Sequence, residues 1–466
     1  MTLRSKRPRP KRNKQRGVAL LLVLTWLALM IALVGEFTYG TSVDVAQAAN
    51  ARDELKAHYL ARSAVNLSRL LIKIQKQFVD PVMGQAQKLI SSAMGSQGAS
   101  GAGGSSGAAS SSPAGLGFSL RVTDYAGPLM GFFSGSKDEV AGLGSLVGID
   151  TSGIKGLGLK SGHFDAEITY EDGKIDLNCG SNGPIADTKK QVIVYRLLMA
   201  LMQSPRFDKL FSEADNSGQF TTRTDVARAL IDWADADESM FSPDGTAASG
   251  EDYRYDARAD HYRAHNGIYD TIEEIKMVRG VSDGFMEAFQ PSLTVYPTDP
   301  TQACRVNLAA ISNKNGGDCT PLLMGVLRAA AQPDPTKPPS DPTILDDTRL
   351  YPVASVLCDR ASAGGFDSLN TITSVMQRPA SAVMPDDPRY KILNGMSPIN
   401  ISAADLAKVA FTGSPRIYRI VAMGEAGKVK KKITAIVDSG GFLSNPVTLN
   451  AQAEKAAGVL RYWREE

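Results

Sequence analysis

The stretch Arg16–Val34, RGVALLLVLTWLALMIALV, decides how the rest of the chain is placed. It follows a basic tail, and it contains no charged residue after Arg16. As a helix, the segment Val18–Val34 would be about 26 Å long, which is close to the thickness of the hydrocarbon core of a bilayer. The sequence therefore predicts one membrane-spanning helix at this position.

Eight basic residues precede the apolar segment, and no carboxylate lies among them. They are Arg4, Lys6, Arg7, Arg9, Lys11, Arg12, Lys14 and Arg16. The positive-inside rule keeps such a tail cytoplasmic, so the remaining chain is expected on the exported side of the membrane. Without this tail the chain has 43 basic against 49 acidic residues, a net charge of about −6. That balance gives no general support to nucleic-acid binding.

Two ordinary interpretations of the segment stay open. A secretory signal peptide has a cleavage site directly after its apolar core, whereas the small-residue site Ala46-Gln47-Ala48 lies well beyond it here. A plain signal anchor fits the length better. Neither interpretation accounts for Gly17, which stands at the boundary between the basic tail and the apolar run.

The residues Gln15–Leu21, QRGVALL, resemble the leader of a type IV prepilin. In that family a prepilin peptidase cleaves after the glycine, here between Gly17 and Val18, and the new N-terminus is methylated. Most pilins carry Glu as the fifth mature residue, where this chain has Leu22. A buried carboxylate is costly unless it is paired, and in pilins it pairs with the terminal amine of a neighbouring subunit. Leu22 therefore favours a subunit at the tip of a fibre, as in the K-type minor pseudopilins of the type II secretion system.

Further motifs carry the same resemblance along most of residues 15–466. They are Glu171-Asp172-Gly173-Lys174-Ile175-Asp176-Leu177-Asn178, Leu230-Ile231-Asp232-Trp233-Ala234-Asp235-Ala236-Asp237 and Gly250-Glu251-Asp252-Tyr253. The resemblance implies an α+β, pilin-like fold, in which a long N-terminal transmembrane helix packs on an antiparallel sheet. It also implies a large inserted α-helical domain of two sterile-alpha-motif-like modules.

The function implied by the resemblance is structural rather than enzymatic. A K-type subunit helps to initiate and cap a periplasmic fibre that exports folded proteins across the outer membrane. Its expected partners are the I and J types, the H type, the major pseudopilin, the prepilin peptidase and the inner-membrane assembly platform. The sequence also contains no nucleophile beside a base, no phosphate-binding loop and no haem or iron–sulfur spacing.

The predicted domains follow changes in composition along the chain. They are a leader (1–17), a transmembrane segment (18–34), the periplasmic half of the long helix (35–82), a Gly/Ser-rich flexible loop (83–162), sheet strands (163–182), a first helical module with the acidic segment (183–300), a second module (301–412) and C-terminal strands (413–466). A weak repeat between Tyr269–Ile275 and Phe366–Ile372 suggests the two modules.

Periodicity predicts the elements of the pilin-like part. Apolar residues recur every three or four positions from Leu60 to Phe78, which indicates a helix with one buried face. Alternation predicts a hairpin of 163–170 with 175–178, and a second of 416–423 with 428–437 around the turn 424–427. A last strand is expected at 458–463.

The chain becomes acidic between Asp225 and Asp260, where it carries ten carboxylates. Crowded carboxylates repel one another, and a hard cation such as calcium relieves this repulsion. The spacing does not match an EF-hand, so a solvated acidic surface is the alternative. In the K-type family calcium is bound in this domain, and the resemblance implies Asp235, Asp237, Glu251 and Asp252 as ligands.

Three other functions are alternatives for parts of the sequence. His261 and His265 are four apart, but Tyr262 stands where a metalloprotease motif has Glu, which argues against zinc. A membrane-tethered helix-hairpin-helix protein of the competence type would bind nucleic acid, but Asp283 and Glu287 beside the available glycines would repel phosphate. A metal-dependent periplasmic hydrolase would use the acidic segment.

Four cysteines, Cys179, Cys304, Cys319 and Cys358, lie on the predicted periplasmic side, where disulfides form. Three pairings are possible. Cys304 and Cys319 are the nearest in sequence, and closing their loop would contribute about 3 kcal/mol in the chain-entropy model. This pair is therefore the predicted disulfide, with Cys179 and Cys358 either paired or free.

Overall fold

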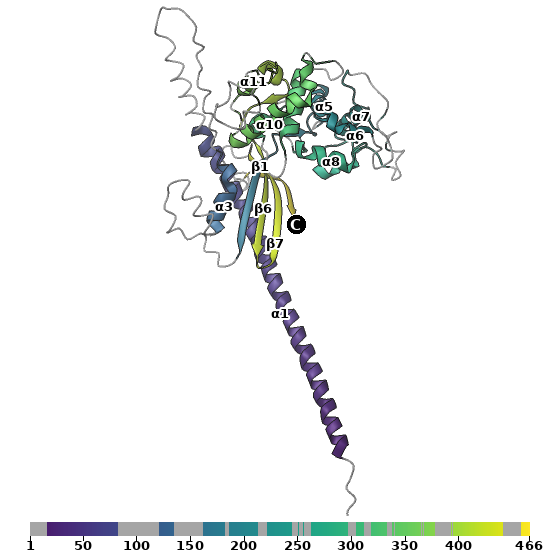
Figure 1. Cartoon of the computed structure of the whole chain (residues 1–466), viewed down its shortest axis with the longest axis vertical. Helices are drawn as coiled ribbons and strands as arrows, with labels where there is room; N and C mark the ends of the chain where they lie inside the picture. The colour runs from purple at the N-terminus through teal and green to yellow at the C-terminus, as the bar shows by residue number, and fades with distance from the viewer. Residues whose placement is uncertain are drawn as a thin grey trace, which may run out of the picture.

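In the computed structural model, one long helix extends well beyond a body that is made of a sheet and a helical head (Figure 1). The described residues are 16–82, 121–134, 162–181, 186–212, 221–244, 250, 255, 262–296, 304–311, 318–332, 338–339, 341–364, 366, 368–377, 393, 395–440 and 458–466. The predicted leader lies outside them, apart from its last two residues.

Helix α1 (Arg16–Ile74) continues into a short π-helix, η1 (Gln75–Val79). Its first half projects from the body, and its second half crosses a sheet (Figure 1). The predicted stripe is largely buried in the second half, because Leu60, Ala64 and Leu71 are 8%, 0% and 6% exposed. Phe78, by contrast, is 64% exposed, since the helical geometry changes at η1 and turns this residue to solvent.

The sheet under α1 has four antiparallel strands in the order β1-β6-β7-β8. They are β1 (His163–Tyr170), β6 (Ile417–Ala426), β7 (Val429–Asp438) and β8 (Val459–Glu465). Strands β6 and β7 form the second predicted hairpin, and β8 is the predicted last strand. The hairpin turn is only Gly427 and Lys428, so Gly424 lies within β6 rather than in the turn.

Gly424 lets helix and sheet approach closely. A Cβ at this position would lie 2.1 Å from the carbonyl oxygen of Ala57 in α1. Small residues on the helix, Ala57 and Ala61, face the same contact and are fully buried. The pilin-like core therefore forms between alanines of α1 and the apolar face of β1, β6 and β7.

Part of the segment predicted as a flexible loop is helical. Residues Val122–Tyr125 form the 3-10 helix η3, and Ala126–Ser134 form α3, which packs on β1. The prediction was wrong here because apolar residues of α3 pack on the body, where Met130 is fully buried. The Gly/Ser/Ala tract itself lies outside the described residues.

The helical head, residues 175–411, is inserted between β1 and β6 (Figure 1). Its longer helices are α5 (Thr188–Met202), α7 (Arg223–Asp232), α8 (Asp283–Phe289), α9 (Thr320–Ala331), α10 (Asp347–Gly364) and α11 (Leu369–Gln377). The shorter ones are η4 (Pro205–Phe207), α6 (Asp208–Ser212), η6 (Ile272–Met277), η7 (Gln290–Ser292), η9 (Leu308–Ala310), η10 (Pro342–Leu345) and α12 (Ala403–Leu406). Both predicted modules contribute to one hydrophobic core, in which α5 packs on α9. Their sterile-alpha-motif-like character stays a prediction.

The first predicted hairpin is wrong. Strand β1 pairs with β6, while β2 (Ile175–Asp176) runs parallel to β3 (Leu293–Thr294) in a separate two-stranded sheet. A second parallel pair joins β4 (Val306–Asn307) to β5 (Ala410–Phe411). The turn after β1 therefore leads out of the pilin-like sheet and into the head, so the predicted strand region 163–182 is split between the two.

The predicted disulfide is also wrong. Cys179 pairs with Cys304, and Cys319 pairs with Cys358, so no cysteine is free. Cys179 follows β2 and Cys304 precedes β4, and folding of the head brings these two segments together. Cys319 stands at the start of α9 and meets Cys358 of α10, because α9 and α10 pack on each other. Tertiary packing thus overrides proximity in sequence.

Candidate functional site

The N-terminal half of α1 is not covered by the rest of the described chain, and this uncovered half is the first candidate functional feature. Among the described residues, one helix is long and apolar enough to cross a membrane, and its most apolar window has no buried residue. Val18, Leu22 and Trp26 are 59%, 57% and 62% exposed. Gly17 and Val18, the predicted processing site, lie in the first turn of this helix. The geometry fits a membrane anchor whose surface is free to contact lipid or other helices.

Exposed apolar residues continue beyond the predicted membrane segment. Phe37, Tyr39 and Val45 are 74%, 72% and 66% exposed, and all precede the point where α1 meets the sheet. Large apolar side chains on an uncovered helix surface are costly in water, so this surface is expected to lie against another apolar surface.

The acidic segment is built on helix α7. Thr222 caps this helix in a capping box with Asp225, whose backbone N–H donates to Thr222 Oγ1 at 3.2 Å. The apolar face of α7 is buried, so its last residue, Asp232, is carried into the interior at 5% exposure. There Asp232 Oδ1 accepts a hydrogen bond from the Phe241 backbone N–H at 2.6 Å.

Asp235 is the most unusual of the four predicted ligands. It is 2% exposed, and its Oδ2 accepts a hydrogen bond from Gln191 Nε2 at 2.8 Å. Its Oδ1 is buried and has no hydrogen-bond partner among the described residues. A buried carboxylate oxygen without a donor is costly. A cation beside it would remove that cost, so Asp235 fits the role of a metal ligand.

The electrostatics of this segment are unfavourable to ionised carboxylates. Burial raises the pKa of Asp232 to about 8, and the nearby charges of Asp235 and Asp237 act in the same direction. Burial also raises the pKa of Asp235 to about 7, again with a contribution from Asp237. Asp232 is one of the ten carboxylates of the acidic segment but not one of the predicted ligands, and its burial depends on how α7 packs.

The remaining predicted ligands are only partly described. Asp237 is exposed, and its Oδ1 accepts a hydrogen bond from the Ser239 backbone N–H at 2.8 Å. Ser239 forms an antiparallel bridge with Gly250, which returns the chain to the first half of the acidic segment. Glu251 and Asp252 directly follow but lie outside the described residues. Within the described ranges no three metal-type side chains are grouped as a site.

His265 serves a structural purpose. Its Nδ1 lies 3.3 Å from a carboxylate oxygen of Glu274, and its ring packs on Trp233. Trp233 Nε1 donates to the same carboxylate at 3.0 Å. The other member of the candidate zinc pair, His261, lies outside the described residues.

The junction turn, Glu171–Lys174, joins the pilin-like sheet to the head. The Glu171 side chain is fully buried and accepts from Arg419 Nε at 2.6 Å, Lys174 Nζ at 3.0 Å and Thr294 Oγ1 at 2.6 Å. Burial acts to raise the pKa of Glu171, but the charges of Lys174 and Arg419 outweigh it and lower this pKa to about 2. Sheet strand β6 and head strand β3 are thus held by one carboxylate.

Two neighbouring residues strengthen the junction turn. The Asp172 carboxylate accepts hydrogen bonds from the backbone N–H groups of Arg416 and Ile417, although burial raises its pKa to about 6. A Cβ on Gly173 would lie 2.7 Å from the Ala310 carbonyl oxygen, so only glycine fits against η9. The turn itself is predictable from the sequence, but its role in joining sheet and head is not, because Arg419 lies 248 positions away from Glu171.

These features together define a pilin-like architecture, with an uncovered apolar helix, an antiparallel sheet under the second half of that helix and a large inserted head. Residues 181–298, in that head, match the model of the family "Type II secretion system (T2SS), protein K". This match confirms the K-type minor pseudopilin resemblance given by the leader and the turn motif. The family is a structural part of a secretion system and is not known for catalysis.

Comparison with solved structures gives a distant likeness. A chain of the crystal structure of the GspK-GspI-GspJ complex, from the type 2 secretion system of enterotoxigenic Escherichia coli, is 14% identical. The match covers 66% of this chain and 81% of that chain, with a TM-score of 0.38. No curated protein matches the sequence.

Proposed function

We propose that this protein is the tip subunit of a type II secretion pseudopilus, where it helps to start and cap the fibre. The observation that carries the proposal is the bare first half of α1, in which Leu22 occupies the position of the usual Glu. An apolar residue there makes no charge pair with a further subunit. The head, inserted above the sheet, would also block addition of another subunit.

The proposed topology places the basic tail in the cytoplasm and the head in the periplasm. The prepilin peptidase would cut between Gly17 and Val18, and Val18 would be methylated. Lateral partners would be the I- and J-type minor pseudopilins, which would cover Phe37, Tyr39 and Val45. These three side chains support the proposal because they are exposed between the anchor and the body.

A mass measurement of the mature N-terminus tests the processing step. After coexpression with a prepilin peptidase, we expect a chain that begins at methylated Val18. A Gly17→Leu variant serves as the control and is expected to stay uncut. An uncut wild-type chain would exclude the pseudopilin assignment.

Labelling of assembled fibres tests the position at the tip. Antibody against the head is expected to mark one end of each fibre in electron micrographs. In a Leu22→Glu variant the charge pair with a further subunit becomes available, and some internal labelling is expected. Labelling of the wild-type protein along the whole fibre would contradict the tip assignment.

We also propose that the acidic segment binds calcium. Asp235, Asp237, Glu251 and Asp252 would hold the ion, and the buried Oδ1 of Asp235 supports this choice. Calcium would neutralise the crowded carboxylates and fix the loop that follows α7. The expected test is a calcium-dependent rise in melting temperature that Asp235→Asn abolishes; equal melting with calcium and with a chelator would exclude the site.

A further inference from the structure

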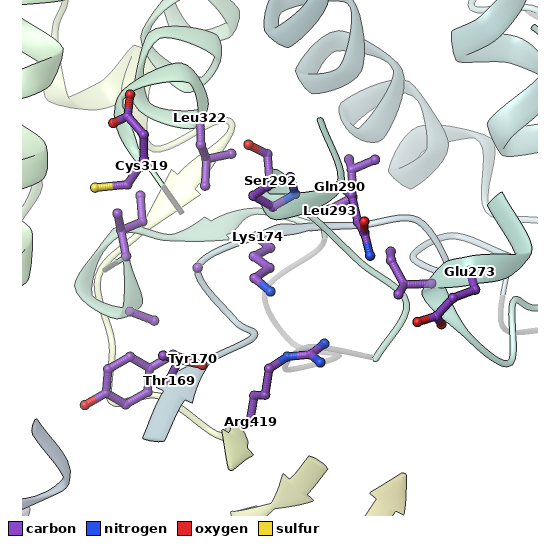
Figure 2. Close-up of a pocket in the computed structure, with 16 residues that line it drawn as sticks. Thr169, Tyr170, Lys174, Glu273, Gln290, Ser292, Leu293, Cys319, Leu322 and Arg419 are labelled. Atoms are coloured by element: carbon purple, nitrogen blue, oxygen red, sulfur yellow. The ribbon is translucent and has the colours of Figure 1, made fainter. Parts of the chain in front are cut away.

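A cavity of about 300 Å³ lies where the pilin-like sheet meets the head (Figure 2). One side is formed by the end of β1, the junction turn and Arg419 of β6. The other side is formed by η6, η7 and the start of α9. Neither the anchor nor the acidic segment contributes to it, and the junction turn borders it on one side.

Two cations enter this cavity from different elements. Figure 2 shows Lys174, from the junction turn, and Arg419, from β6, with their charged ends directed toward the same space. Both are bonded to the single carboxylate of Glu171, at 3.0 Å and 2.6 Å. The second oxygen of Glu171 accepts from Thr294 at 2.6 Å. Two positive charges therefore share one negative charge, which leaves the group with a net charge of about +1.

Hydrogen-bond donors remain after this pairing. Arg419 gives its Nε–H to Glu171, and its Nη1 and Nη2 atoms donate to no atom of the described residues. Lys174 uses one of its three N–H groups on Glu171. Both side chains are about one quarter exposed, and both line the cavity. An arginine fork beside an ammonium is suited to a carboxylate.

Two acidic residues at the edge of the cavity are engaged elsewhere. A Glu273 carboxylate oxygen lies 3.5 Å from Nη1 of Arg464, and Asp318 Oδ1 accepts from the Thr320 backbone N–H at 2.8 Å. They leave the donors of Arg419 available, but they disfavour a ligand with more than one negative charge. Together with Glu171, they make a single carboxylate a better match than a phosphate dianion.

We propose that this cavity binds one carboxylate, supplied by an Asp or Glu side chain on an exposed segment of a partner protein. The cavity is at the lower limit of ligand sites and has room for one side chain with its adjoining backbone. The bound carboxylate would accept from the Nη atoms of Arg419 and from Lys174. Because the cavity lies between sheet and head, an occupant would contact both parts at once.

The test uses the full chain in non-ionic detergent, with ¹⁵N-labelled arginine. The Nε–H resonance of Arg419, assigned by its absence from Arg419→Lys, is followed during titration with N-acetyl-glutamate amide. We expect a saturable shift, and about tenfold weaker binding of N-acetyl-glutamine amide, which has the same shape without the charge. Equal shifts with both probes, or none with either, would overturn the proposal.

Variants locate the binding event. Lys174→Met is expected to weaken binding of the glutamate probe about tenfold. Gln290→Trp keeps every charge and fills the cavity from η7, so it is expected to abolish the shift even if Lys174→Met does not fold. The matched control is Lys408→Gln, which removes an exposed cation paired with Asp405 on α12, and it should bind as wild type. Unchanged binding in Gln290→Trp would place the probe elsewhere and refute the site.

Discussion

Two buried carboxylates, one in the junction turn and one in the acidic segment, behave in opposite ways. Glu171 is fully buried and Asp235 is 2% exposed, yet the pKa of Glu171 falls to about 2 and that of Asp235 rises to about 7. The difference lies in their partners. Glu171 has two cations and a hydroxyl, whereas Asp235 has one amide and an unpaired oxygen. Burial alone does not decide the charge state of a carboxylate.

The two regions should therefore be held in place in different ways. The junction turn satisfies its charges with residues of this chain, so it should hold the head on the sheet without any ligand. The acidic segment leaves carboxylates uncompensated among the described residues, so its order should depend on a cation. Four predictions test this contrast.

The largest effect is expected for Glu171→Gln. This change leaves Lys174 and Arg419 without their shared anion, and breaking a buried ion pair from one side costs about 3–5 kcal/mol. Urea unfolding of the full chain in detergent measures the loss. The control is Glu425→Gln, which removes an exposed partner of Lys430 and should cost roughly 0–1 kcal/mol. Similar losses in the two variants would show that the junction is no stronger than a surface pair.

Removal of calcium is expected to have the next largest effect. At a calcium concentration of about 100 times Kd, the ion would stabilise the folded state by about 2.7 kcal/mol, and a chelator would remove this amount. Calorimetry with and without the chelator measures it. Glu171→Gln should lose the same increment as wild type, because the two sites are independent. A chelator effect that disappears in this variant would mean that the two regions form one unit.

The metal-free protein should become less stable between pH 6 and pH 8. The folded-state pKa values of Asp232 and Asp235 are raised to about 8 and 7, so the folded protein binds more protons than the unfolded chain in this range. Stability then falls as pH rises, by about 1 kcal/mol for a group that titrates at 7. Thermal unfolding in a chelator at both pH values measures the change, and Asp235→Asn should reduce it. Greater stability at pH 8 would contradict the raised pKa values.

Local patterns predicted the pilin-like part of the fold well. The helix of α1 and the hairpin of β6 and β7 depend on periodicity and on neighbours in sequence, and both are confirmed. The turn after β1 has an equally good local pattern, but Ile175 pairs with Leu293 instead of returning to β1. A turn motif fixes the direction of the chain for a few residues and does not reveal which strand lies beside it.

The candidate site was less predictable for the same reason. Acidic composition indicated a cation site, but the burial of Asp235 and its pairing with Gln191, 44 positions earlier, depend on how α5 packs against α7. The disulfides follow the same rule, since Cys179 meets Cys304 across 125 positions. Packing between distant segments decides which polar groups are paired. The pattern of a single sequence does not show which distant segments meet.

The smallest effect, and the sharpest test of the contrast, is expected for Asp237→Asn. In a chelator the change removes a like charge near Asp232 and Asp235, so the variant should be more stable than wild type by about 0.5 kcal/mol, the scale of a surface charge interaction. With calcium the same change removes a ligand, so the variant should be less stable than wild type. Glu238→Gln, an exposed neighbour outside the predicted ligand set, should show no such reversal. Because a merely structural Asp237 would change stability in one direction under both conditions, a reversal of sign in calorimetry is specific to a cation held by this segment.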